Sequence, residues 1–158
     1  MNAFEKFIQD LYGAVIREDR WQLYLEGLKN TVLIALTACL IGIFIAGLGA
    51  MVAFAAQMSM GSSWRVGVVG GETGDLVSGG LYRFSRNPTF VGQAALLTGV
   101  ALTVPSVPTV MAPILFLWSA STQIRSEEAA LRASLGPDYD RYAASVPRWM
   151  GFNRRELP

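Results

Sequence analysis

The segment Gly79–Gly92 (GGLYRFSRNPTFVG) contains the side chains of this sequence that are best suited to binding a ligand. It is basic and aromatic, a proline interrupts it, and it opens onto an apolar run. An acidic pair, Glu127 and Glu128, stands at the far end of the next apolar run. A carboxylate at a membrane boundary is unfavourable unless it is paired or bound to something. The segment and the acidic pair therefore predict two walls of one site at a membrane surface.

The two glutamates face different neighbours if they lie on a helix. Glu128 then faces Arg125 and Arg132 at helical spacing, which is an ordinary ion-pair arrangement. We expect a structural role for this carboxylate. Glu127 shares a face with Gln123 instead, and a structural role and a functional role both remain open for it. A cationic ligand would be a suitable partner for Glu127.

The other side chains of the Gly79–Gly92 segment also allow two interpretations each. Arg83 and Arg86 either anchor lipid headgroups or recognise a carboxylate, for which the guanidinium fork is well shaped. Asn87 either caps a helix that begins at Pro88 or binds a ligand. The aromatic residues either lie in a membrane-interface belt or form the walls of a pocket for an adenine or a sulfonium. They are Tyr82, Phe84 and Phe90.

The composition predicts a membrane protein. The chain has 158 residues, of which 52% are hydrophobic and only 16% are charged, whereas soluble domains carry about 25% charged residues. A net charge of +1 gives no overall field that would favour nucleic acid. The sequence has one cysteine, Cys39, so an intrachain disulfide is excluded. It has no histidine, so the commonest general base is missing. We expect no metal site.

The apolar runs predict an all-α integral membrane protein. Residues 1–30 are amphipathic and are expected to lie at a membrane interface or to pack as a soluble helix. Residues 31–56 carry no charge and are long enough to span a bilayer. Small residues recur at intervals of four on this helix and predict a face for close contact with a partner helix. They are Ala38, Gly42, Ala46 and Ala50.

The remainder of the chain is expected to form a surface loop, a helical hairpin and a helical cap. Residues 57–88 are polar and rich in glycine, which predicts the loop. Residues 89–104 and 105–122 are apolar and are joined by a proline-rich turn. The second helix is expected to run on to a stop at Gly136 and Pro137, before a last short helix over residues 138–145.

The distribution of basic residues predicts the orientation of these elements. The loop and the C-terminal part together carry more arginine and lysine than the N-terminal flank. By the positive-inside rule, the N-terminus lies outside, and the site and the helical cap face the cytosol of a bacterial inner membrane.

Four pieces of the sequence occur in a specific order with specific gaps. They are MGSSWRVGV (Met60–Val68), LVSGGLYRFSRNPTFVG (Leu76–Gly92), EEAALRASLGPDYDRY (Glu127–Tyr142) and VPRW (Val146–Trp149). On these pieces, residues 57–152 resemble the isoprenylcysteine carboxyl methyltransferase family and its relatives, the membrane phospholipid methyltransferases. The resemblance implies that S-adenosylmethionine binds at the cytosolic surface and that a lipophilic substrate enters from the bilayer.

The resemblance also implies the residues of the site. The cofactor contacts carried over by position are Gly74, Asp75, Leu76, Val77, Tyr82, Asn87, Pro88, Thr89, Phe90 and Glu127. Arg86 and Arg125 are expected to orient the acceptor, with Glu127 as the third residue of the catalytic site. Many members have histidine where this chain has Asn87. The eukaryotic enzymes have an arginine where this chain has Gln123, with Arg125 nearby.

The first fifty residues resemble a different family. The stretch EDRWQLYLEGLKNTVLIALTACLIGIFIAGLGA (residues 18–50) resembles the start of an amino-acid ABC transporter permease. The chain therefore divides into an interfacial segment (1–30), a permease-like transmembrane helix (31–56), a methyltransferase-like domain (57–152) and a tail (153–158), with a junction between families near residue 50.

We predict a membrane methyltransferase that transfers the methyl group of S-adenosylmethionine to a lipophilic acceptor. A carboxylate, such as that of a prenylated cysteine or a related small lipid, suits a chain without histidine because it needs no general base. An amine acceptor, as in phospholipid methylation, remains open. The alternatives are a non-catalytic membrane scaffold, a fragment of an ABC-transporter permease, and a small protein that dimerises through the face of small residues.

Overall fold

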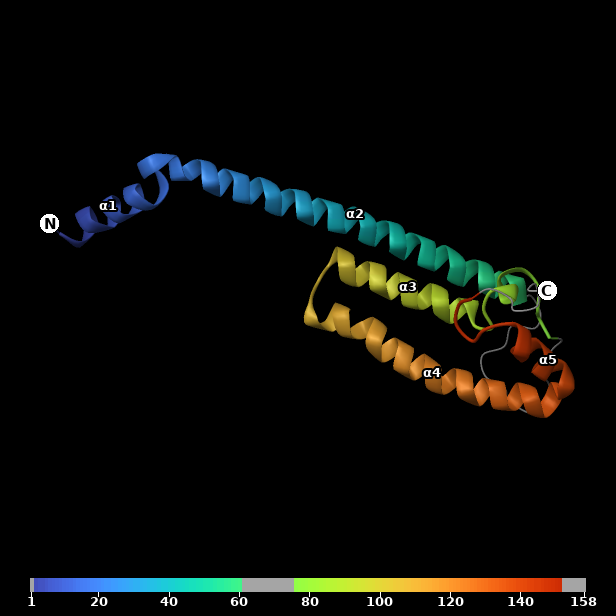
Figure 1. Ribbon diagram of the computed structural model, residues 1–158. Helices are drawn as coiled ribbons and strands as arrows, with labels where there is room; N and C mark the ends of the chain where they lie inside the picture. The colour runs from blue at the N-terminus through green and yellow to red at the C-terminus, as the bar shows by residue number, and fades with distance from the viewer. Residues whose placement is uncertain (1, 61–75, 152–158) are drawn as a thin grey trace. The chain divides into compact units, whose positions relative to one another are not determined.

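The computed structural model describes residues 2–60 and 76–151, and these residues are helical apart from short connections. The elements are α1 (Ala3–Val15), η1 (Arg17–Asp19), α2 (Arg20–Met60), η3 (Gly80–Arg83), α3 (Pro88–Thr103), α4 (Val107–Leu135) and α5 (Pro137–Ser145) (Figure 1). Two of them, α2 and α4, are long and apolar enough to cross a membrane, and α3 is a shorter apolar helix. The prediction of an all-α membrane protein is confirmed for the described residues.

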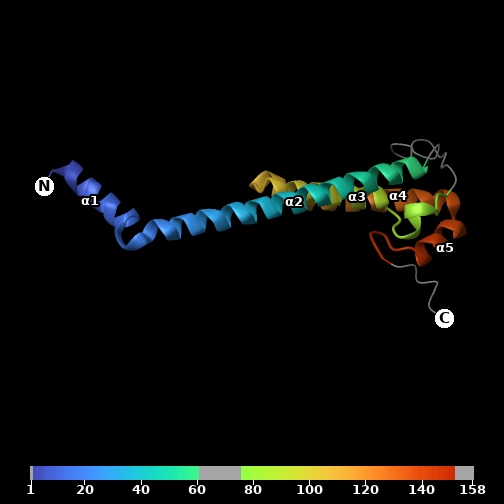
Figure 2. The same ribbon diagram turned by 90° about the horizontal axis from the view of Figure 1, so that it is seen from above.

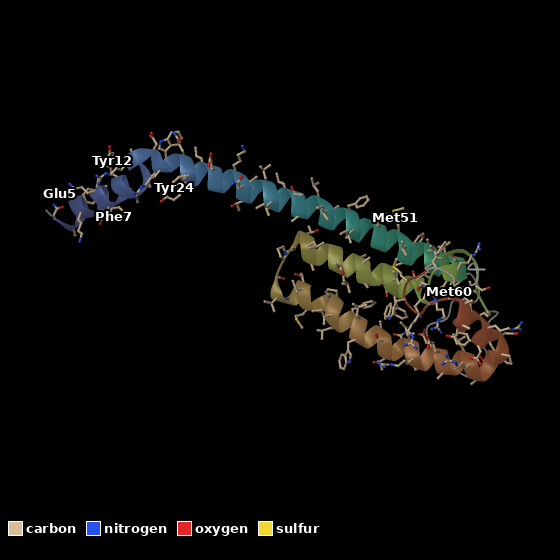
Figure 3. All side chains as sticks on the ribbon, viewed as in Figure 1. Glu5, Phe7, Tyr12, Tyr24, Met51 and Met60 are labelled. Carbon is tan, nitrogen blue, oxygen red and sulfur yellow. The ribbon has the colours of Figure 1, made fainter. Side chains whose placement is uncertain are left out.

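The chain divides into two compact units between Cys39 and Leu40. In the first unit, a capping box begins α1: the Asn2 side chain accepts from the Glu5 backbone N–H at 3.0 Å, and the Glu5 carboxylate accepts from the Asn2 N–H at 3.1 Å. No residue of α1 is buried. Its apolar face is open, since Phe7 and Tyr12 are 60% and 57% exposed (Figure 3). The interfacial position predicted for this segment stays a prediction.

In the second unit, the part of α2 that follows Leu40 packs closely against α3. Gly49 of α2 faces Gly92 of α3, and a Cβ atom added at Gly49 would lie 2.6 Å from the Gly92 carbonyl oxygen. Gly42 and Gly99 form a second contact of the same kind, one heptad away on each helix. Because the two backbones touch at these points, only glycine fits there.

The face of small residues on α2 differs from the predicted one. Gly42 and Ala46 lie on this face as predicted. The face then continues through Gly49 and Ala53, because the residues of α2 that contact α3 are alternately four and three positions apart. That alternation keeps one stripe of a helix with 3.6 residues per turn in contact, whereas a strict interval of four drifts around the helix. Ala50 is consequently exposed. Ala38 belongs to the first unit.

The predicted helical hairpin is present as α3 and α4. A second capping box begins α4, in which the Ser106 backbone N–H donates to Thr109 Oγ1 at 2.9 Å. The same hydroxyl donates to the Val104 carbonyl at 2.7 Å, which closes the turn. As a result, α3 lies between the second half of α2 and α4 (Figure 1 and Figure 2).

A helical cap closes the end of the hairpin at which α3 begins (Figure 2). Gly136, at φ +51, ends α4 at the predicted stop, and α5 folds back against α4. The buried centre of this cap consists of Tyr139, Tyr142 and Val146, against which Leu76 and Leu131 pack. The Tyr142 hydroxyl donates to the Tyr82 backbone carbonyl at 2.8 Å, which joins α5 to η3.

We predict that Gly49→Ala and Gly47→Ala, two residues apart on α2, have opposite effects on stability. Gly47 has no atom within 4 Å of an added Cβ, so alanine there stabilises the helix by up to about 1 kcal/mol. At Gly49 the added Cβ meets the backbone of α3, so the substitution costs about 1–3 kcal/mol. Unfolding of the purified protein in detergent measures both changes, and equal effects would contradict the packing.

Candidate functional site

A buried carboxylate, Glu128, binds two arginines. Its side chain is 5% exposed, and it accepts from Arg148 Nε at 2.9 Å and from Arg148 Nη2 at 2.7 Å. Arg86 Nη1 lies 3.1 Å from the carboxylate oxygen that Arg148 Nε also contacts. A buried charge is tolerated only with such pairing and hydrogen bonding. Three segments far apart in the sequence therefore meet at one carboxylate.

The ion pairs predicted for Glu128 within its own helix are wrong. Arg132 pairs with Asp140 of α5 at 3.2 Å instead. Arg125 is exposed, and its Nε donates to the Ser121 carbonyl at 3.1 Å. Glu128 lies on the inward side of α4, where it contacts one segment before α3 and one after α5. Both partners are far away in the sequence, so the spacing of residues along α4 does not predict them.

Asn87 stands at the N-cap position of α3, but its side chain makes no capping hydrogen bond, so the capping interpretation is wrong. Its Nδ2 donates to the Arg148 backbone carbonyl at 3.0 Å instead. Its backbone N–H donates to Ser85 Oγ at 3.0 Å. Pro88 occupies the first turn of α3, as predicted. The side chain of Asn87 thus holds the C-terminal segment rather than its own helix.

A second polar cluster comprises Tyr82, Thr89 and Glu127. Burial raises the pKa of the Tyr82 phenol, the adjacent Thr89 hydroxyl lowers that pKa in part, and the negative charge of Glu127 raises it further. Thr89 Oγ1 is buried and lies within reach of the Tyr82 phenol, but it makes no hydrogen bond of good geometry to residues 2–60 and 76–151. One oxygen of Glu127 accepts from Gln123 Nε2 at 2.8 Å.

The three side chains of this cluster have the chemistry to bind a polar ligand. A buried hydroxyl without a partner is unfavourable in an unliganded protein, and a bound group that accepts or donates a hydrogen bond removes that cost. The phenol, the hydroxyl and the carboxylate suit a ligand with both positive and polar groups, such as the amino-acid end of S-adenosylmethionine. The N–H groups of Thr89 and Phe90 precede the first intrahelical bond of α3, from Val91 N to the Asn87 carbonyl.

The other predicted site residues lie around these two clusters. Leu76 packs on the tyrosine core of the cap, and Val77 is half-buried. Phe90 contacts Phe116 of α4, with ring centroids 6.2 Å apart. Gly74 and Asp75 lie outside the described residues. The predicted contacts that the structure describes therefore come from the start of α3, the preceding turn and α4.

An apolar groove of about 420 Å³, which sequence reasoning missed, lies where α3, α4 and the C-terminal segment meet. It is lined by Val91, Ala94, Leu117, Ser121, Trp149 and Met150. The lining residues of α3 and α4 recur at helical spacing, a pattern that any membrane-embedded helix face shows. Only the return of residues 149 and 150 to the hairpin makes a groove of them, and no local pattern predicts that return.

We predict that Glu128→Ala destabilises the protein far more than Glu127→Ala. The first change leaves the largely buried Arg86 without its anion, which costs about 3–5 kcal/mol. The second removes a hydrogen bond at a partly exposed carboxylate and costs less than about 1 kcal/mol. Unfolding midpoints in detergent provide the comparison, and similar losses for both variants would contradict the assignment of roles.

We also predict a loss of stability in alkali. Burial raises the pKa of Tyr142 above the value of about 10 that the phenol has when unfolded, and the nearby Tyr82 and Tyr139 phenols add to this. The unfolded state therefore loses its proton first, so this contribution is complete below about pH 10 and is lost as the pH rises further. Unfolding curves from pH 8 to 11.5 measure it. Tyr142→Phe should lessen the alkaline loss, whereas Tyr12→Phe, at an exposed residue, should leave it unchanged.

The family model described as phospholipid methyltransferase matches residues 37–138. The match begins inside the helix predicted over residues 31–56. It therefore includes most of the helix whose sequence resembles an ABC transporter permease. It covers both walls of the site, including Tyr82, Thr89 and Glu127. Neither a curated protein nor a solved structure matches the chain. Because the matched region makes up more than half of the sequence, this membrane protein belongs to the phospholipid methyltransferase family.

Proposed function

We propose that the protein transfers the methyl group of S-adenosylmethionine to a lipophilic acceptor at the cytosolic surface of a bacterial inner membrane. Membership of the phospholipid methyltransferase family supports methyl transfer to a lipid-type acceptor. The observation that carries the choice of cofactor is the cluster of Tyr82, Thr89 and Glu127, in which the buried Thr89 hydroxyl makes no hydrogen bond of good geometry to residues 2–60 and 76–151. No feature of residues 2–60 and 76–151 favours a permease fragment or a scaffold.

The residues around Thr89 would hold the cofactor. Glu127 would attract its positive charge, and the N–H groups that precede the first intrahelical bond of α3 suit its carboxylate. The Tyr82 ring and Phe90 provide apolar surface. Bound there, S-adenosylmethionine would supply an electrophilic methyl group on its sulfonium. The remaining proposed contacts are Gly74, Asp75, Leu76, Val77, Asn87 and Pro88.

The acceptor would lie with its apolar chain in the groove between α3, α4 and Trp149. Arg125 stands one helical turn from Ser121, which lines that groove, and its exposed guanidinium would orient an acceptor carboxylate. Arg86 is less suited to that role because Glu128 and Tyr139 already occupy its Nη1. The chain's task is then to align the two substrates and to exclude water.

We predict that purified protein in lipid nanodiscs binds S-adenosylmethionine, and that Thr89→Val weakens this binding about tenfold through the loss of one hydrogen bond. Glu127→Gln is expected to weaken it by a similar factor. Thr98→Val is the matched control, because Thr98 lies on the same helix with its hydroxyl bonded to Ala94. Calorimetric titration gives the dissociation constants. No binding by the unaltered protein would contradict the proposed function.

The acceptor class has its own test. Membranes containing the protein are incubated with radiolabelled S-adenosylmethionine and a lipid extract. A carboxylate acceptor yields a methyl ester, whose label is released as methanol by mild alkali. An amine acceptor yields label that resists alkali, and this outcome would contradict the carboxylate proposal while leaving methyl transfer intact.

A further inference from the structure

The C-terminal segment Pro147–Gly151, here called the strap, is bound along the turn that precedes α3. The Arg86 backbone N–H donates to the Pro147 carbonyl at 3.0 Å, and the Gly151 N–H donates to the Phe84 carbonyl at 3.3 Å. The Arg148 carbonyl accepts from Asn87 Nδ2 at 3.0 Å. The strap has no helical structure of its own, and these hydrogen bonds, together with a weaker one from Ser85 Oγ to the Arg148 carbonyl at 3.4 Å and one ion pair, hold it in position.

Neighbouring residues of the strap reach two different places. Arg148 binds Glu128 through two guanidinium nitrogens. Trp149 and Met150, which follow directly, line the apolar groove. The arginine side chain is 41% exposed, whereas the carboxylate is 5% exposed, so the strap covers Glu128 from the solvent side. A movement of the strap therefore changes the groove and uncovers a buried charge at the same time.

The strap also contacts the residues at the start of α3. It holds Arg86 and Asn87, and Thr89 follows within the first turn of the helix. Displacing the strap removes the hydrogen bonds that it makes with Arg86 and Asn87, and so loosens the turn that leads to Thr89. The family match ends at residue 138, before the strap, so family membership assigns no role to it.

We propose that the strap couples the cofactor site to the groove, with Arg148 as a positioning residue. The hydrocarbon chain of an acceptor in the groove packs against Trp149 and Met150 and so favours the closed strap. The closed strap holds the start of α3 in the position that binds the cofactor. Linkage then requires each ligand to tighten the binding of the other by the same factor. This inference takes its two ligands from the proposed function.

The test measures the affinity for S-adenosylhomocysteine, the unreactive product, with and without saturating N-acetyl-S-farnesylcysteine as the groove probe. In the unaltered protein in nanodiscs, the probe should tighten binding about fivefold or more. The ratio of the two dissociation constants, without and with the probe, should fall to about one in Arg148→Ala. In Arg148→Lys this ratio should be intermediate, because lysine keeps the charge without the bidentate contact. Asp140→Asn is the control, since it removes an exposed ion pair between α4 and α5 and leaves the strap's own contacts in place.

The possible results separate the two proposals. A ratio of one in the unaltered protein, or an unchanged ratio in Arg148→Ala and Arg148→Lys, would overturn the coupling while the proposed function stands. A lower affinity with an unchanged ratio would mean that Arg148 only stabilises the fold. No binding of S-adenosylhomocysteine by the unaltered protein would overturn both proposals. If Arg148→Ala does not fold, Arg148→Lys carries the comparison, together with amide hydrogen exchange of the strap, which the probe should slow.

Discussion

The buried carboxylate of Glu128 is the interaction on which the polar end of this protein depends. A carboxylate that is almost fully covered needs compensation by opposite charge and by hydrogen bonds. Here two arginines from distant parts of the chain supply both. The turn before α3, the end of α4 and the segment after α5 are consequently held together at one point. The geometry of Tyr82, Thr89 and Glu127, and the wall of the groove, follow from that arrangement.

The apolar part of the second unit follows a different rule. Within a bilayer there is little hydrophobic force between helices, so close backbone contact becomes the main source of association. The glycines of α2 and α3 provide that contact at Gly42 with Gly99 and at Gly49 with Gly92. The two polar clusters, around Glu128 and around Thr89, lie instead at the end of the hairpin that α5 closes. An apolar acceptor and a polar cofactor would therefore approach the same place from different media.

Much of the fold could be predicted because it depends on local patterns. Apolar runs and prolines indicated the hairpin, the first turn of α3 at Pro88, and the end of α4 at Gly136. The failures involve long-range partners. Glu128 has arginines at ideal helical spacing, yet it binds Arg86 and Arg148, because the fold turns its side of α4 inward. Asn87 has the chemistry of a cap, but a carbonyl of the strap competes successfully for its side chain.

The same distinction applies to the candidate site. Its residues on the turn and on α4 were predicted from a resemblance that extends over several motifs, and the family match spans these positions. The groove was missed because Trp149 and Met150 reach it only through the closed strap. On α2, the contacts with α3 follow intervals of four and three rather than the predicted interval of four alone, and a partner helix from another chain stays a prediction.

Photochemical labelling tests whether Tyr82, Thr89 and Glu127 bind the methyl donor. Ultraviolet irradiation of the protein with radiolabelled S-adenosylmethionine, followed by digestion and mass spectrometry, identifies the labelled peptides. The account predicts label in peptides that contain Tyr82, Thr89 or Glu127, and predicts that unlabelled S-adenosylhomocysteine prevents it. Label confined to peptides from residues 1–60, or label that the competitor does not reduce, would contradict the account.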